Sequence, residues 1–471
     1  MTNIITMSKN YEKWKTLEGG SQVYLNKYSG EWFVSAQLTE RLFGRLRYGI
    51  ATEELKELSP AEASNLAKLI DAGIVDVGSN NSDRRPSIER GQVTLVIIEA
   101  LNYCNLACTY CFEDVPTKGR KMTFETADTI VSSIEKLNLA KNFVIEFNGG
   151  ESFSNIKTLY HIVSNVENSK IKTNHNVSYG VTSNLTYLNE QIVCLLKKYN
   201  FSVSVSLDGE KLDHDKNRIF STGKGSHDKI MNNIKILNEN NISFSTISVI
   251  SDPGQLTRSY NFLKSIKIPY VSFAIRRHSS RKPLEDIDYS FIANELFEAF
   301  QDSFLHFQKK TFSPKLLDAV ILIKNLVSPH DPQYMCLRTP CGAGTNMITY
   351  DTGGDIYICQ DLIKEPAFKV CNASDPEPQD LIDNNDIVKK LRSRKPGGNI
   401  GCEECDFQMF CQGGCYSTSY YASNKDVPAS FTKKTPHCEF YYQSFSTMLG
   451  YVASDPSGLA EYINSTPYIY D

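Results

Sequence analysis

The sequence predicts an α/β protein with a partial barrel of six β/α units at its centre and a smaller domain on each side. Between residues 93 and 300, six strand-like runs alternate with amphipathic segments, a pattern that builds a parallel sheet. A short segment of strands and helices precedes this region, and a segment rich in cysteine and glycine follows it. Because a complete barrel has eight units, we expect a partial (β/α)6 TIM-like barrel whose site lies at the carboxyl ends of the strands.

The bulk composition excludes several classes of protein. The 471 residues are 41% hydrophobic and 22% charged, which is typical of a folded chain. A net charge of -4 and a pI near 6.1 lack the basic character of nucleic-acid-binding proteins. The sequence has no run of about 18 apolar residues, the length that a membrane helix needs, and the first residues lack the apolar core of a signal peptide. We therefore expect no membrane partner and a cytoplasmic location.

Residues 1–80 predict a small domain with a winged-helix-like order of elements. Residues 21–28 and 31–35 indicate two short strands, and a helical pattern follows them. Ser59 is the expected N-cap of the next helix because Glu62 completes a capping box with it, and a closing strand is expected soon after that helix. Residues 81–92 belong to a polar, charged stretch that predicts a linker.

The barrel is predicted from residue 93 to residue 300. Its six strands are expected at residues 93–99, 143–147, 176–182, 201–207, 244–250 and 270–275. Beyond the barrel, residues 301–335 predict a helical bridge and residues 336–450 a separate domain. The regular pattern of that domain is sparse, which suits a module held by metal, and residues 451–471 form a C-terminal tail.

Three of the thirteen cysteines, Cys104, Cys108 and Cys111, stand within eight residues directly after the first predicted barrel strand. In a reducing compartment, cysteines grouped in this way indicate metal or cluster ligation more than disulfides. A [4Fe–4S] cluster takes four ligands, so three thiols leave one iron open to a small molecule. Zinc fits less well because no fourth ligand lies nearby. The plain alternative is a set of small buried residues without a ligand.

The spacing C-x3-C-x2-C, with Tyr110 before the last cysteine, resembles the signature of radical S-adenosylmethionine (SAM) enzymes. Gly149-Gly150-Glu151 follows the second predicted strand and resembles the Gly-Gly-Glu-Pro motif of that superfamily, with Ser152 in place of the proline. The resemblance implies a [4Fe–4S] cluster that binds SAM, and it implies that Gly149, Gly150 and Glu151 hold the SAM amino group.

Small polar side chains at the ends of the third and fourth predicted strands are further candidates for binding SAM. Outside this context such residues are often simple caps. The resemblance implies a role in binding the ribose or the carboxylate for Ser183, Ser206 and Asp208.

Most of the other cysteines lie in the C-terminal region. By spacing alone, Cys402 to Cys438 are compatible with zinc, and an oxidised, disulfide-bonded region is a remote alternative. The run from Cys341 through Gly354 to Cys359, together with Cys402 to Cys438, resembles the SPASM domain, which binds auxiliary iron–sulfur clusters.

The resemblance implies two auxiliary [4Fe–4S] clusters, and therefore three clusters and SAM as the cofactors. It places Cys336, Cys341, Cys359 and Cys415 around an inner cluster and Cys402, Cys405, Cys411 and Cys438 around an outer one. If Cys336 is not a ligand, the inner cluster has an open iron. Cys194 is expected in the apolar core, and Cys371 has no predicted role.

The resemblance also implies a reaction, in which SAM is cleaved reductively to a 5'-deoxyadenosyl radical that abstracts a substrate hydrogen. Auxiliary clusters would take up or relay a second electron, which suits a net two-electron oxidation. Residues 1–80, including Trp32, resemble a RiPP recognition element, a domain that binds the leader of a precursor peptide as an added strand. The alternatives for this domain are a DNA-binding winged helix and a packing module without a ligand.

We therefore expect a peptide maturase that cross-links side chains of a ribosomally made precursor, through a carbon–carbon (cyclophane-like) or a thioether bond. A flavodoxin- or ferredoxin-type protein is the expected electron donor. The first alternative is an anaerobic sulfatase-maturing enzyme, in which an Asp directly follows the cysteine that corresponds to Cys359; here Gln360 does, and Asp361, a candidate general base, is one residue late. The second is a non-catalytic iron–sulfur electron carrier or regulator, which would not need Gly149, Gly150 and Glu151.

Overall fold

The computed structural model describes residues 4–8, 11–18, 20–35, 40–71, 74–76, 91–277, 287–328, 334–454 and 456–466. The centre of these residues is a ten-stranded sheet in the order β13-β12-β11-β10-β9-β8-β7-β14-β15-β16. Six adjacent strands are parallel: β7 (Val93–Glu99), β8 (Leu139–Asn148), β9 (Asn176–Ser183), β10 (Ser202–Ser206), β11 (Phe244–Ile250) and β12 (Tyr270–Ile275). All six predicted strands are present, and the predicted parallel α/β sheet is confirmed.

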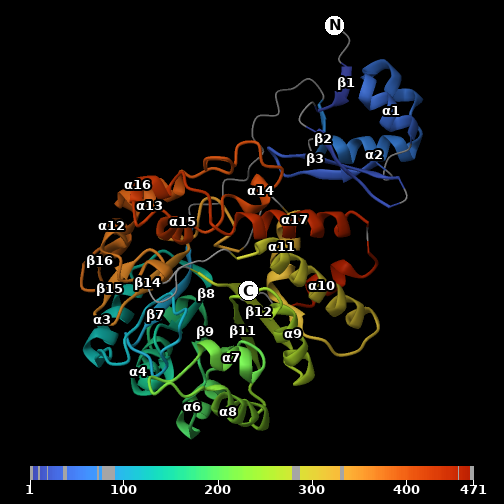
Figure 1. The fold of residues 1–471 in the computed structure, drawn as a ribbon. Helices are drawn as coiled ribbons and strands as arrows, with labels where there is room; N and C mark the ends of the chain where they lie inside the picture. The colour runs from blue at the N-terminus through green and yellow to red at the C-terminus, as the bar shows by residue number, and fades with distance from the viewer. Residues whose placement is uncertain are drawn as a thin grey trace.

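Helices cover the outer face of these strands (Figure 1). Side-chain caps begin several of them, for example at Thr123 and Asn189, whose side chains accept hydrogen bonds from backbone N–H groups of the first turn. The helices between the barrel strands are α3 (Phe124–Ile134), α4 (Ile156–Glu167), α5 (Lys170–Asn174), α6 (Glu190–Lys198), α7 (Lys211–Asn217), α8 (His227–Glu239) and α9 (Gln255–Ser265).

The two faces of the barrel strands differ in exposure. Side chains that point outward, such as Ile145 and Val205, are buried beneath the helices. Most side chains that point inward on β8 to β12 are only half-buried, and we call the space that they line the barrel lumen. On β7 the inward side chains of Leu95 and Ile97 are instead buried against Met335 and Met347. The barrel is therefore filled beside β7 and open along the other strands.

The cysteine-rich region shares the sheet of the barrel. Strand β14 (Met347–Tyr350) pairs in parallel with β7, with Leu95 opposite Met347 and Ile98 opposite Tyr350. The sequence pattern suggested a separate module for residues 336–450, but hydrogen bonds of the central sheet run into this region. The remaining strands of the sheet are β13 (Lys315–Leu316), β15 (Asp355–Tyr357) and β16 (Lys369–Asn372).

Helices of the C-terminal half pack beside the barrel (Figure 1). The two that precede the cysteine-rich region are α10 (Tyr289–Gln308) and α11 (Leu317–Val327). The others are α12 (Pro378–Asn384), α13 (Asp386–Arg392), α14 (Gln408–Cys411), α15 (Tyr416–Ala422), α16 (Val427–Ser430), α17 (Cys438–Val452) and α18 (Leu459–Asn464). No described helix is both long enough and apolar enough to cross a membrane.

The N-terminal domain contains two small sheets, ordered β5-β1-β6 and β2-β3-β4 among the described strands. The predicted capping box is present: the Glu62 carboxylate accepts from the Ser59 backbone N–H at 2.9 Å, and Ser59 Oγ accepts from the Glu62 N–H at 3.2 Å. The elements are β1 (Ile4–Met7), β2 (Tyr11–Thr16), β3 (Gln22–Asn26), β4 (Trp32–Val34), α1 (Glu40–Tyr48), β5 (Ile50–Ala51), α2 (Pro60–Asp71) and β6 (Val75–Asp76).

One sheet of the N-terminal domain packs against the cysteine-rich region, above α17 and α14 in Figure 1. The Trp14 ring meets the Phe407 ring edge-on at 5.7 Å, and Trp32 Nε1 donates to the Leu326 carbonyl at 2.9 Å. The predicted linker, residues 81–92, lies outside the described residues up to residue 90.

The expectation that Cys194 lies in the core is wrong, because its side chain is exposed. Helix α6 buries Ile192, Leu195 and Leu196. At about 100° per residue, Cys194 points away from the face that these three residues share.

Candidate active site

The loop that carries Cys104, Cys108 and Cys111 leaves the carboxyl end of β7 and is fixed by backbone hydrogen bonds. The Ala107 N–H donates to the Ile219 carbonyl at 2.7 Å, and the Thr109 N–H donates to the Asn217 carbonyl at 3.0 Å. Cys104 is buried and the other two thiols are partly exposed. The loop is therefore held by the end of α7 and the residues just after it, and its three thiols share one small region at the mouth of the barrel.

Donors surround the sulfur of Cys104. The Leu106 N–H and the Asn184 side-chain amide both point at Sγ from 3.4 Å. Burial, and then the charge of Glu151, raise the pKa of the Cys104 thiol, so a thiolate here depends on a nearby positive charge such as iron. Three thiols in one loop, with N–H donors on one sulfur, fit an iron–sulfur cluster. Among the described residues, no three His, Cys, Asp or Glu side chains converge closely enough to hold one single metal ion.

Gly149 and Gly150 bring the end of β8 against this loop. Both have positive φ, +81° and +39°, and a Cβ on Gly150 would lie 2.0 Å from the Tyr103 carbonyl oxygen. The Glu151 side chain is fully buried and accepts from Ser183 Oγ at 2.7 Å and from the Asn184 N–H at 2.8 Å. Burial raises the pKa of Glu151 to about 7. The carboxylate that the resemblance assigned to SAM thus also ties β8 to the end of β9.

Tyr110 and Asp208 meet beneath the cysteine loop. The Tyr110 hydroxyl donates to the Asp208 carboxylate, to which Arg218 Nε also donates at 3.0 Å, and the second Asp208 oxygen accepts from the Val249 N–H at 2.9 Å. Asp208 is fully buried, and both oxygens of this carboxylate, which was predicted to bind SAM, already accept hydrogen bonds from the protein itself. Ser206, the last residue of β10, is half-buried and faces the barrel lumen.

Three acidic or amide side chains at the mouth of the barrel were not predicted. Glu99 ends β7, is buried, and its Oε1 has no hydrogen-bond partner among the described residues. Burial raises the pKa of Glu99 to about 8. Glu113 accepts from the Gly150 N–H at 3.2 Å and from Gln360 Nε2 at 2.7 Å. The signal for Glu99 was a charged residue at the end of an otherwise apolar strand, whereas Glu113 and Gln360 meet only in the folded chain.

The eight cysteines of the C-terminal region form two groups. Burial raises the pKa of the Cys359 thiol, and the nearby thiols of Cys415 and Cys341 raise it further. The side chains of Cys336 and Cys415 are hydrogen-bonded to each other. The members of the first group are Cys336, Cys341, Cys359 and Cys415, and those of the second are Cys402, Cys405, Cys411 and Cys438. None of the thirteen cysteines forms a disulfide. These groups have the same members as the two predicted ligand sets, and ligation itself stays a prediction.

Asp361, the candidate general base, lies between the two halves of the site. Its carboxylate accepts from Arg277 and, at 2.8 Å, from Ser417 Oγ, which contacts the Cys415 sulfur at 3.1 Å. The Arg277 guanidinium also lies 5.3 Å from the centre of the Phe112 ring, next to Cys111. Asp361 is therefore paired to a cation that connects the first cysteine loop to the inner group of thiols.

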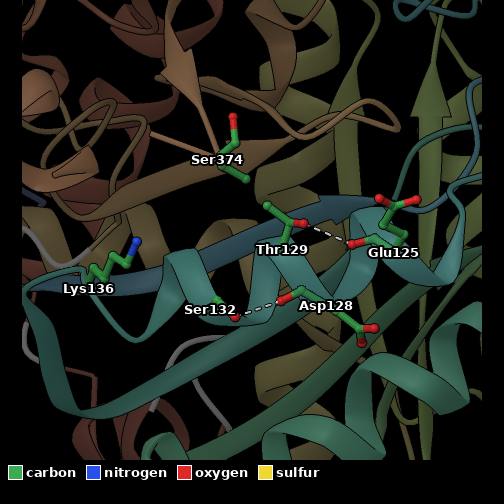
Figure 2. A pocket seen from close by; sticks show the side chains of 7 residues that line it. Glu125, Asp128, Thr129, Ser132, Lys136 and Ser374 are labelled. Carbon is green, nitrogen blue, oxygen red and sulfur yellow. Dashed lines mark hydrogen bonds between the residues drawn. The ribbon is translucent and has the colours of Figure 1, made fainter. Parts of the chain in front are cut away.

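A separate surface hollow of about 560 Å³ lies beside α3 (Figure 2). Its side chains include Glu125, Asp128 and Lys136, and none of them belongs to the cysteine groups or to the mouth of the barrel. Two of its hydroxyls bond back to carbonyls of α3 itself, Thr129 to Glu125 and Ser132 to Asp128. This hollow is the outer face of a helix and brings no chemistry to the site.

A parallel barrel with a three-thiol loop after its first strand and a Gly-Gly-Glu turn after its second defines an iron–sulfur enzyme of the radical SAM type. Residues 98–255 match the model of the Radical SAM superfamily. The chain thus contains a radical SAM domain and is a radical SAM enzyme, which implies one [4Fe–4S] cluster and SAM as cofactors.

Known proteins resemble the chain well beyond this domain. A cysteine-type anaerobic sulfatase-maturating enzyme from Clostridium novyi is 26% identical over 340 residues, which are 69% of this chain and 87% of that protein. The structure of anSMEcpe with bound AdoMet has a TM-score of 0.65 at 19% identity, over 79% of this chain and 98% of the other. The structure of Streptococcus suis SuiB bound to precursor peptide SuiA has a TM-score of 0.54 at 17% identity, over 92% and 99%.

Proposed function

We propose that the protein is a peptide maturase that oxidatively cross-links side chains of a ribosomally synthesised precursor, through a carbon–carbon or a thioether bond. The observation that carries the proposal is the N-terminal domain. Residues 93–471 make up about four fifths of the chain, so the match to SuiB, which covers 92% of it, extends into this domain. SuiB was solved with its precursor peptide, and we infer that this domain likewise receives the leader of a peptide.

The domain offers strand edges for such a leader. In the sheet β2-β3-β4, the outer strands β2 and β4 have no further strand beside them among the described residues. An extended peptide adds to such an edge through main-chain hydrogen bonds, and pockets for alternate side chains give specificity. Because the same sheet packs against the cysteine-rich region through Trp14 and against α11 through Trp32, a leader bound there starts its path at a fixed position relative to the barrel.

The cofactors would be held by the three groups of cysteines. The triad at Cys104 would hold the cluster that binds SAM, and the two C-terminal groups would hold auxiliary clusters. The bound cofactors supply one-electron chemistry, and the chain positions the peptide and excludes water. A net two-electron oxidation releases a second electron, for which the inner group around Cys415 is the acceptor nearest the site in this proposal, and a flavodoxin or ferredoxin is the proposed external donor.

The test is the intact mass of a precursor peptide encoded near the enzyme after anaerobic co-expression. We expect a product two hydrogens lighter than the precursor, with the new bond located by fragmentation. The control is the variant with Cys104, Cys108 and Cys111 replaced by Ala, which should leave the mass unchanged. An unmodified peptide despite rapid SAM cleavage would refute cross-linking, and absence of SAM cleavage by the reconstituted protein would favour a non-catalytic electron carrier.

The second candidate is an anaerobic sulfatase-maturating enzyme, favoured by the likeness to the Clostridium novyi protein and to anSMEcpe. In that class an Asp is expected directly after the position of Cys359. Here Gln360 bridges Asn148, at 2.9 Å, and Glu113, at 2.7 Å, so a neutral amide occupies the place of the expected carboxylate. Offering the reconstituted enzyme a sulfatase-derived peptide tests this candidate, and a change in the mass of that peptide would favour it over cross-linking.

A further inference from the structure

Many of the side chains that line the barrel lumen are small and polar. The inward positions of β9 to β12 carry hydroxyl groups, small residues and, on β11, the apolar side chains of Ile247 and Val249. Most of these side chains are half-buried although both neighbours of each in its strand are buried. The hydroxyls belong to Thr182, Ser204, Ser206, Ser245 and Ser272. Short hydroxyl side chains offer hydrogen-bond acceptors but carry no charge themselves. Ser272 donates to the carboxylate of Asp318, on α11, at 3.2 Å, and Ser204 contacts Ser245 at 3.3 Å.

Among the inward side chains of strands β8 to β12, one carboxylate breaks this pattern. Glu146 points inward from β8, and its Oε1 accepts from Thr182 Oγ1 at 3.0 Å. Its Oε2 lies over Gly180 of the next strand, where a Cβ would come within 1.9 Å of that oxygen. Glycine at position 180 therefore makes room for the carboxylate, and Thr182 fixes its orientation.

Glu146 has no counter-ion in the described part of the chain. None of the described ion pairs includes it, and burial, opposed only by the hydrogen bond from Thr182, raises the pKa of Glu146 to about 7. A carboxylate in such a place is stabilised when a cation arrives. Glu146 lies three residues before Gly149, roughly 10 Å along the strand, and so sits deeper in the lumen than the residues expected to bind SAM.

We propose that Glu146 receives a positively charged side chain, lysine or arginine, of the substrate inside the barrel lumen. That the substrate is a peptide rests on the proposed function. The carboxylate neutralises the charge, and the surrounding hydroxyls accept the remaining N–H donors of the ammonium or guanidinium group. Gly180 and Thr182 are positioning residues for this contact.

The test measures binding of blocked tripeptides to the reconstituted holoenzyme with SAM present. Acetylated, amidated Gly-Lys-Gly and Gly-Arg-Gly are compared with the norleucine peptide by ligand-observed NMR titration. We expect the cationic probes to bind about tenfold more tightly than norleucine to the wild type, and equally to Glu146→Gln. Gly180→Ala should reduce the preference by displacing the carboxylate, while the control Glu125→Gln, which removes an exposed charge on α3, should preserve it.

Two outcomes would overturn the proposal. One is the same affinity for cationic and norleucine probes, or undetectable binding of all of them, in the wild type. The other is a Glu146→Gln variant that loses affinity for SAM by the same factor as for the cationic probes, because the carboxylate would then serve the cofactor. If the preference for cations holds but no precursor peptide is cross-linked, the proposed function fails and the lumen contact stands; the reverse result rejects the contact alone.

Discussion

Cys104, Cys108 and Cys111 lie in one loop of eight residues, whereas the thiols around Cys415 come from segments spread over residues 336–415. The first set needs little more than the carboxyl end of β7 and the backbone contacts to residues 217 and 219. The second set needs β14 and β15 in place, because Cys359 lies two residues after the end of β15. Bringing distant segments together costs loop-closure entropy, so the proposed cluster binding in the C-terminal region would be coupled to its folding, while the first loop is largely prepared by the barrel.

The largest expected effect is the loss of SAM cleavage when a thiol of the first loop is removed. Cys108→Ala removes one of only three thiols in the first loop, so SAM cleavage should fall to the background of the iron-free protein. Release of 5'-deoxyadenosine under anaerobic reduction measures this. The matched control is Cys194→Ala, whose thiol is exposed and belongs to neither region. Cleavage by Cys108→Ala at the wild-type rate would show that the loop does not hold the reactive cluster.

A second substitution tests whether the two regions are separable. Cys415→Ala should lower the iron content by about four per chain, because the proposed inner [4Fe–4S] cluster would be lost, while SAM cleavage without peptide modification persists. Iron analysis and 5'-deoxyadenosine release are measured on the same sample. Cys371→Ala, at a buried thiol outside both groups, serves as the control. If Cys415→Ala also abolishes SAM cleavage, the first loop depends on the C-terminal region more than its local construction implies.

The buried Arg218–Asp208 ion pair beneath the first loop is expected to contribute strongly to the free energy of unfolding. Arg218→Met leaves Asp208 buried without its cation, which should cost about 3–5 kcal/mol of unfolding free energy. Arg258→Met, which breaks the more exposed pair with Asp213, should cost less than about 1 kcal/mol. Urea unfolding of both variants gives the comparison. Equal losses of unfolding free energy in the two variants would show that the buried Arg218–Asp208 pair stabilises the protein no more than the exposed pair does.

The smallest expected effect is a pH dependence at His214. Its Nδ1 accepts from the Asp208 N–H at 3.2 Å and its Nε2 contacts Ser226 Oγ at 2.9 Å, which fixes the neutral ring. Burial lowers the pKa of His214 from 6.5 to about 3. This contribution to stability is present above pH 6.5 and is lost as the pH falls toward 3.

Between pH 8 and pH 5 the loss should be about 2 kcal/mol. Wild type and His214→Gln are compared by urea unfolding at both pH values, and the wild type should lose about 2 kcal/mol more than the variant. Identical losses in the two proteins would contradict a neutral His214 in the native state.

Sequence patterns predicted what depends on local order. The six strands follow from alternating and apolar runs, and the first thiol triad follows from its spacing, because those features are written in short stretches of chain. The division of the C-terminal cysteines into two sets came only from the resemblance to the SPASM domain. What could not be predicted is how distant polar groups satisfy one another. Arg218 and Tyr110 share Asp208, and Gln360 reaches Glu113 across more than 200 positions, and no local pattern encodes either contact.

Cys194 and Glu146 show two kinds of feature that the sequence alone could not predict. Cys194 was assigned to the core because apolar neighbours flank it, yet its angular position on α6 turns it outward. Glu146 was not singled out in the sequence although it is the one charged residue in the run 143–147, because only the half-buried inner face of the folded barrel gives that charge a place to act.

The parallel pairing of β14 with β7 has a consequence for how the chain is made. While the chain is being synthesised, β7 is the exposed edge of the barrel sheet until residues 347–350 have left the ribosome. At about 5–20 residues per second, that delay lasts roughly 10 to 50 seconds. An open apolar edge of this kind attracts other strands. Nascent chains that stop short of β14 should therefore aggregate or recruit chaperones, however well their first cysteine loop is formed.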